Sequence, residues 1–238
     1  MAARPIKTLS QLDPERIRDN LAMVRSEVAA ACRRAGRDPQ GVEIVAASKY
    51  ISVDGMEALA QAGINVVGEN RAQDLVAKHE CYGGRFTWDF IGHLQSNKVR
   101  QILPLVRLIH SVDSLSAVRE IDRRTPGGIT TNVLLEVNIG QERGKYGIIP
   151  SEVDRFLEEA AKFPKVNFTG LMTMPPPAAD PEVVRPAFAA LRRLASELSQ
   201  KWHGKYSFEN LSMGTSQDFV AAVEEGATIV RVGGVLYG

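Results

Sequence analysis

A lysine at the end of an apolar run is the residue of this sequence with the clearest chemical potential. Residues 42–47 read Val-Glu-Ile-Val-Ala-Ala and are followed by Ser48 and Lys49. Such a run is typical of a strand that is buried on both faces of a sheet. An amine that loses solvation at such a place has a lowered pKa and attacks a carbonyl to form a Schiff base. A lysine that extends to water from a strand end is the alternative, and this stretch alone favours it.

A second segment, near the carboxyl terminus, has the composition of an anion-binding site. Thr215 and Asp218 have the spacing of a capping box, which predicts that a helix begins there. Free backbone N–H groups and the helix dipole favour a phosphate at such a terminus. Ser212 and Ser216 add hydroxyl donors at the same place. For the side chains of Thr215 and Asp218 themselves we expect simple capping.

The last strand-like run adds two glycines and an arginine. Gly233 and Gly234 let backbone N–H groups approach an anion closely, although a tight turn or bulge is the alternative. Arg231 stands between two valines, so its side chain is expected to point opposite to theirs. An inward guanidinium is costly unless it is paired, so it needs a carboxylate partner or a ligand atom. A lysine that can react with a carbonyl, a site for an anion and an inward arginine together suggest that the chain binds pyridoxal 5′-phosphate.

These residues are positioned by a chain in which strands and helices alternate. Apolar residues at helical spacing predict a long amphipathic helix over 15–36. The strand-like runs that follow lie at 42–48, 64–67, 88–92, 105–112, 132–139, 166–174, 208–212 and 228–236. Helical segments are expected between them, and this alternation implies a parallel sheet with right-handed crossovers.

Eight strand–helix units are the number that closes a (β/α)₈ TIM barrel, for which about 250 residues are typical. We therefore predict a single (β/α)₈ barrel domain over residues 1–238, with an open doubly wound sheet as the structural alternative. No helix is expected after the run 228–236, and the helix over 15–36 is expected to cover that face. Active sites of such barrels lie at the carboxyl ends of the strands, where Lys49, Ser212 and Arg231 are expected.

Composition excludes several classes of protein. With 44% hydrophobic and 24% charged residues, the chain has the make-up of an ordinary globular protein. The net charge of +1 gives no electrostatic case for nucleic acid or an anionic membrane as a partner. Cys32 and Cys81 suit neither a disulfide framework nor a Cys-x-x-Cys metal site, and the four histidines lack metal-ligand spacing. Without a signal segment or an apolar run of about 18 residues, a cytoplasmic location is expected.

The sequence also resembles the YggS/PROSC family of pyridoxal phosphate homeostasis proteins, over essentially its full length. The matching stretches are Ala47-Ser48-Lys49, Gly68-Glu69-Asn70, Phe90 through Lys98, Gly170-Leu171-Met172, and Leu211 to Gly214 together with Arg231 to Gly233. Five such stretches in register form a highly specific match. The resemblance implies the barrel fold of the alanine racemase barrel domain, without that enzyme's carboxyl-terminal β-domain.

The resemblance further implies a role for each candidate residue. Lys49 corresponds to the lysine that carries pyridoxal phosphate as a Schiff base, and Arg231 to the arginine near the pyridine nitrogen. Asn70 matches a residue that lines the cofactor pocket. The phosphate-binding region matches at Ser212, Ser216, Gly233 and Gly234. Gly234 stands where threonine or serine is frequent, so one hydroxyl contact to the phosphate is expected to be missing.

An arginine at the pyridine nitrogen bears on function, because it keeps that nitrogen unprotonated and weakens the cofactor as an electron sink. The tyrosine that the racemase uses belongs to the domain that is absent here. We therefore expect a monomeric binding protein that buffers or delivers pyridoxal phosphate to apo-enzymes, without turnover of its own. The alternatives are an amino-acid racemase or related enzyme that uses the same Schiff base, and a phosphate-binding barrel enzyme without pyridoxal phosphate.

Overall fold

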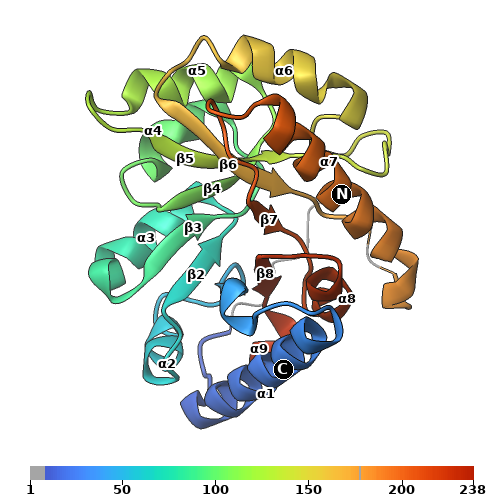
Figure 1. Ribbon diagram of the computed structural model, residues 1–238. Helices are drawn as coiled ribbons and strands as arrows, with labels where there is room; N and C mark the ends of the chain where they lie inside the picture. The colour runs from blue at the N-terminus through green and yellow to red at the C-terminus, as the bar shows by residue number, and fades with distance from the viewer. Residues whose placement is uncertain (1–8, 177) are drawn as a thin grey trace.

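A closed barrel of eight parallel strands forms the centre of the computed structural model, which describes residues 9–176 and 178–238 (Figure 1). The strands pair in sequence order, and the last pairs with the first. They are β1 (Glu43–Ala47), β2 (Val66–Glu69), β3 (Thr87–Phe90), β4 (Leu108–Val112), β5 (Thr131–Glu136), β6 (Val166–Met172), β7 (Asn210–Ser212) and β8 (Ile229–Val232). The predicted (β/α)₈ barrel is therefore confirmed, and the open sheet is excluded.

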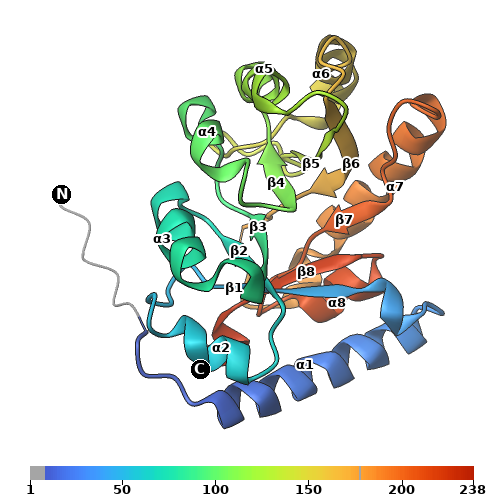
Figure 2. The ribbon, with the colours of Figure 1, turned by 90° about the vertical axis from the view of Figure 1, so that its left-hand side faces the viewer.

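Helices surround the barrel on its outer side (Figure 2). They are α1 (Pro14–Arg34), α2 (Met56–Gln61), α3 (Ala72–Tyr82), α4 (Val99–Ile102), α5 (Leu115–Arg124), α6 (Val153–Ala160), α7 (Arg185–Lys201), α8 (Phe219–Glu224) and α9 (Gly234–Tyr237). Short 3₁₀ turns lie at Pro39–Gly41, Gly83–Arg85, Ser96–Lys98, Pro150–Glu152 and Pro181–Val183. Within the described ranges, no helix combines the length and the apolar character needed to cross a membrane.

The last strand of the barrel is shorter than the strand expected over 228–236. β8 ends at Val232, and the next residues form the short helix α9. The backbone N–H groups of Gly233 and Val235 both donate to Ser216 Oγ, at 2.9 and 3.3 Å. Because these donors are used by a side chain, the strand cannot continue in the β-ladder. The expectation that no helix follows β8 was therefore wrong.

The amino-terminal helix α1 lies alongside the last units of the barrel (Figure 2). Its buried stripe consists of Ile17, Leu21, Val24, Val28, Ala31 and Cys32. The side chain of Asp13 accepts from Glu15 N at 2.9 Å and caps the first turn, and Gly36, at φ +66°, follows the end of the helix. Asn20 Nδ2 donates to Leu236 O at 3.0 Å and ties α1 to α9. The predicted helix over 15–36 thus covers the expected face.

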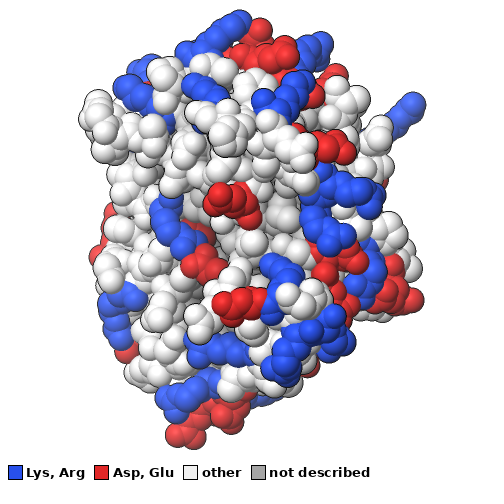
Figure 3. All heavy atoms as spheres, viewed as in Figure 1, with Lys and Arg blue, Asp and Glu red and all other residues white. Residues whose placement is uncertain are grey.

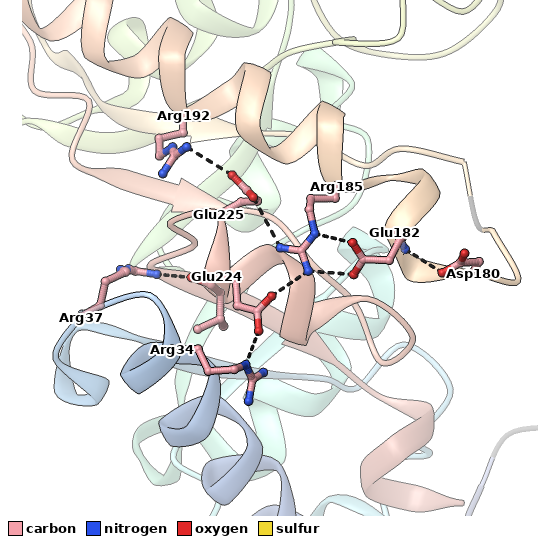
Figure 4. A network of polar contacts seen from close by, with 9 residues as sticks. Arg34, Arg37, Asp180, Glu182, Arg185, Arg192, Glu224 and Glu225 are labelled. Atoms are coloured by element: carbon pink, nitrogen blue, oxygen red, sulfur yellow. Dashed lines mark hydrogen bonds and ion pairs between the residues drawn. The ribbon is translucent and has the colours of Figure 1, made fainter.

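Ion pairs join α1 to α7 and α8 (Figure 4). Glu224 on α8 accepts from Arg185 NH2 at 2.6 Å and from Arg34 Nε at 2.5 Å. Burial opposes ionisation of Glu224, but the hydrogen bonds from the two arginines outweigh it and lower the pKa of this carboxyl. Arg185 also binds Glu182 through Nε and NH2, at 2.6 and 2.7 Å. The network fastens the amino-terminal helix to the segment between β7 and β8.

Charges of both signs are interspersed on the face of the molecule shown in Figure 3. Across the described residues, opposite charges also pair over short distances along one helix, such as Glu120 with Arg123 and Arg124. This mixture agrees with the net charge of +1, and the face shown in Figure 3 has no large patch of one charge.

Candidate functional site

Lys49 lies in the turn directly after β1, at the carboxyl end of the barrel. The residue is exposed, and Nζ lies 5.0 Å from the centroid of the Tyr50 ring. Ser48 N still donates to Gly68 O of β2, at 3.0 Å, and residues 49–50 then form a turn that Ile51 N closes on Ser48 O, at 2.8 Å. The structure thus places the amine in solvent reach rather than in the desolvated setting that we considered first. An exposed amine at this position is accessible to an incoming aldehyde.

A buried ion pair supports the residue that precedes Lys49. Lys78 Nζ on α3 pairs with Glu69 Oε1 and also donates to Ser48 O at 2.8 Å. Ser48 Oγ donates to Glu69 Oε1 at 2.6 Å. All three residues are buried, and every polar group of Ser48 has a partner. The network fixes the backbone of Ser48, the residue directly before Lys49.

Ser216 and the two glycines after β8 come together as predicted. Ser216 Oγ accepts the N–H of Gly233 at 2.9 Å, and a Cβ built on Gly234 would meet only this oxygen, at 3.9 Å. A Cβ on Gly233 would lie 3.4 Å from Ala47 O and 3.5 Å from Ala47 Cβ. Ala47 is two residues from Lys49. The structure therefore places the glycine pair and Ser216 beside the strand end that carries the lysine.

The expected helix start at Thr215 was wrong, although its two side chains do meet. Asp218 Oδ1 accepts from Thr215 N at 2.6 Å and from Thr215 Oγ1 at 3.0 Å. Residues 216–218 form a turn, and α8 begins only at Phe219. The capping interaction therefore stabilises a turn between β7 and α8, and Ser216 lies within that turn.

Arg231 points into the barrel and is buried, as its position between two valines predicted. Its NH1 donates to Ser212 Oγ at 2.5 Å and its NH2 to Thr173 O at 3.1 Å. The acceptors are thus a hydroxyl and a carbonyl oxygen rather than a carboxylate. Burial lowers the pKa of Arg231 to about 10, against the opposing charges of Glu136 and Asp218. The guanidinium is still cationic at neutral pH.

Ser212 belongs to a buried chain of hydrogen bonds inside the barrel. Its Oγ lies 2.8 Å from His110 Nδ1, and His110 Nε2 lies 3.1 Å from Asp89 Oδ2. Burial lowers the pKa of His110, although the hydrogen bond to Asp89 opposes this effect. A neutral imidazole donates from Nε2 to the carboxylate and accepts the Ser212 hydroxyl proton at Nδ1, which leaves Ser212 Oγ to accept from Arg231. The Ser212 hydroxyl thus acts on Arg231, in a set of contacts separate from those of Ser216.

Asn70 follows β2 at the same end of the barrel. Its Oδ1 is buried and has no hydrogen-bond partner among the described residues. A Cβ at residue 92 would lie 2.2 Å from Asn70 O, so only glycine fits there. A buried polar atom without a partner is unusual in folded proteins and marks a place where a ligand can supply the missing contact.

A cavity of about 420 Å³ covers the other half of the barrel mouth, over β5 to β8. Its wall includes Glu136, Thr173, Thr215, Asp218 and Arg231. Burial and the nearby charge of Asp113 raise the pKa of Glu136 to about 7, against the effect of Arg231. Lys49 and Asn70 lie outside this wall, at the ends of β1 and β2.

Sequence reasoning missed three buried polar residues of this region: His110, Glu136 and Lys78. His110 and Glu136 interrupt or end apolar runs, which was a usable signal. Lys78 lies in α3, where polar and apolar residues are mixed, and its residue type gives no sign of burial.

Comparison with known proteins places the chain in a family. The family described as "Alanine racemase, N-terminal domain" matches residues 12–238. A protein of Aquifex aeolicus named "Pyridoxal phosphate homeostasis protein" is 40% identical over 222 residues, which cover 92% of this chain and 96% of that protein. A protein of the same name from Pseudomonas aeruginosa is 36% identical over 224 residues, 93% and 95% of the two chains. The chain belongs to the family of pyridoxal phosphate homeostasis proteins.

Solved structures agree with this membership of the pyridoxal phosphate homeostasis family. PipY of Synechococcus elongatus, in the structure described as having pyridoxal phosphate (PLP) bound, superposes with a TM-score of 0.78 at 31% identity, covering 93% of this chain and all of PipY. The alanine racemase of Clostridium difficile superposes with a TM-score of 0.70 at 16% identity, which shows the fold alone. This chain covers 60% of the racemase chain.

Proposed function

We propose that this protein binds pyridoxal 5′-phosphate as a Schiff base on Lys49 and acts in pyridoxal phosphate homeostasis by buffering or delivering it. Relatives at 36–40% identity carry that name, and PipY is described with PLP bound. One observation of this chain carries the proposal. Ala47 O, at the end of β1 just before Lys49, would lie 3.4 Å from a Cβ built on Gly233. Gly233 in turn donates its N–H to Ser216 Oγ.

The residues present fit this cofactor. Ser216, Gly233 and Gly234 would hold the phosphate, since Ser216 supplies a hydroxyl and the open space at Gly234 leaves room for the anion. Asn70 offers a buried amide oxygen without a partner among the described residues, on the neighbouring strand end. Arg231 would face the pyridine nitrogen as a donor, since its own hydrogen bonds leave it cationic. When bound, the cofactor supplies the aldehyde with which the lysine reacts.

A carrier role without turnover is part of the same proposal. A cationic donor at the pyridine nitrogen disfavours carbanion chemistry. The proposal also includes a monomeric state, a cytoplasmic location and apo-enzymes as recipients of the cofactor. The location is supported by Cys32 and Cys81, which are free thiols in the structure, because free thiols suit a reducing compartment. Sedimentation of the purified protein tests the monomer.

The absorption spectrum of the purified protein with pyridoxal phosphate tests the attachment. We expect a visible band that borohydride removes, and its loss in Lys49→Ala. Lys98→Ala is the matched control, because Lys98 lies at the same end of the barrel, after β3. A Lys49→Ala protein that keeps the same band would refute the proposed attachment.

A further inference from the structure

Two cavities adjoin over the ends of β5 and β6. The first, of about 420 Å³, reaches from Glu136 to Arg231, and the second, of about 400 Å³, reaches from Glu136 to Ala187 on α7. Six residues line both: Glu136, Lys145, Tyr146, Thr173, Met174 and Pro175. The cavities are therefore two parts of one recess, which we call the β5–β6 recess.

Glu136 is the charged group of this recess that lacks a partner. It is 8% exposed, and its Oε2 has no hydrogen-bond partner among the described residues. The other charged side chains that line the first cavity are engaged. Arg231 donates to Ser212 and Thr173, Asp218 accepts from Thr215, and Lys145 donates to Glu142. A buried carboxyl without a donor is costly, so the recess is complementary to a ligand that carries a cationic donor.

The second part of the recess is apolar and opens to solvent through an apolar rim. Its wall includes Val137, Ile139, Pro175, Val184 and Ala187. Three large apolar side chains on its lining are exposed: Tyr146 at 58%, Met174 at 58% and Val183 at 68%. Exposed apolar side chains that gather around a concave surface mark a binding site. The complementary ligand therefore combines an ammonium group with an aliphatic stem.

We propose that the β5–β6 recess binds a lysine side chain of another protein, with its methylene stem along the apolar wall and its ammonium group on Glu136. The choice of a protein lysine over a free amine rests on the proposed function, because delivery of an aldehyde cofactor to an apo-enzyme ends on an amine of the recipient. The recess adjoins Arg231, the residue proposed to face the cofactor. The incoming lysine is thus held next to the bound cofactor.

The test uses the full chain without cofactor, titrated with Nα-acetyl-L-lysine N-methylamide and followed by protein NMR. We expect saturable shifts at the recess, and binding about tenfold or more weaker for the norleucine analogue, which has the stem without the ammonium group. Glu136→Gln should weaken the lysine derivative to the level of the norleucine analogue. Glu159→Gln is the matched control, since Glu159 carries the same change of side chain, pairs with Lys162 and lines neither cavity; it should bind as the unaltered protein does.

A second variant keeps the test independent of any folding defect at Glu136. Val183→Ser changes an exposed rim residue without adding charge and should weaken the lysine derivative by lost apolar contact. Equal binding of the norleucine analogue, unchanged binding by Glu136→Gln or unchanged binding by Val183→Ser would each overturn the proposal. Binding of putrescine as tight as that of the blocked lysine would also overturn it, in favour of a free-amine site. No cofactor enters these titrations, so their failure leaves the spectral test of Lys49 standing, and the reverse holds too.

Discussion

The pH dependence of stability in Glu136→Gln tests the electrostatics of the barrel mouth. The pKa of this carboxyl is raised from an ordinary 4.5 to about 7, first by burial and then by the charge of Asp113. The folded state therefore keeps a proton that the unfolded chain releases, so folding is penalised once the pH rises. The penalty is absent below pH 4.5, develops between pH 4.5 and 7, and is complete above pH 7. At about 1.36 kcal/mol per pKa unit it amounts to roughly 3 kcal/mol, of which about 2 kcal/mol develops between pH 5 and 8.

Urea unfolding of the cofactor-free protein at pH 5 and pH 8 measures this penalty. The difference in unfolding free energy between Glu136→Gln and the unaltered protein should rise by about 2 kcal/mol from pH 5 to pH 8. Any constant cost of the amide in the cavity cancels in this comparison. Glu142→Gln, at a half-exposed residue paired with Lys145, is the control for the same change of side chain. A difference for Glu136→Gln that does not vary with pH would refute the assignment of a buried, unpaired carboxyl.

Three further substitutions test the surroundings of Lys49. Lys78→Met leaves Glu69 buried without its partner and should lower the free energy of unfolding in urea by about 3–5 kcal/mol. The double variant with Glu69→Gln should recover much of that stability, and no recovery would contradict the buried pair. Gly92→Ala places a Cβ 2.2 Å from Asn70 O and should lower the thermal midpoint by several degrees, and an unchanged midpoint would show that the backbones are not in such contact. Ser216→Ala should weaken pyridoxal phosphate binding about tenfold in a spectral titration. Circular dichroism should show that the fold is retained. An unaltered affinity would show that this hydroxyl does not belong to the proposed phosphate site.

The barrel was predictable because each strand is an apolar run set off by turn residues, and because such runs recur at a steady interval. The ends of the strands were less predictable. The run 228–236 was expected to be one strand, yet Ser216 accepts from the N–H groups of Gly233 and Val235, and the strand ends at Val232. A hydrogen bond between segments distant in sequence leaves no local pattern, so only the folded structure reveals it.

The candidate site, too, was predictable from the sequence only in part. Lys49 and the glycine pair were predictable, because an amine and a flexible backbone stand out at strand ends. The direction in which a polar side chain points inside the barrel was predictable only for Arg231, between its two valines. All five residues of β4 are buried, so alternation does not reveal that His110 faces Ser212. Glu136 interrupts an apolar run, which draws attention to it, but the sequence does not show that its carboxyl lacks a hydrogen-bond partner within the described part of the chain.

The pairing of β8 with β1 has a consequence for the order of events during synthesis. The strand that leads to Lys49 emerges early from the ribosome, whereas Gly233 and Gly234 emerge after all seven other strands. At about 5–20 residues per second, roughly ten seconds or more separate the two. A nascent chain therefore displays the Lys49 amine well before it has the glycine pair that we propose as part of the phosphate site, and under this proposal cofactor binding waits until β8 closes the barrel.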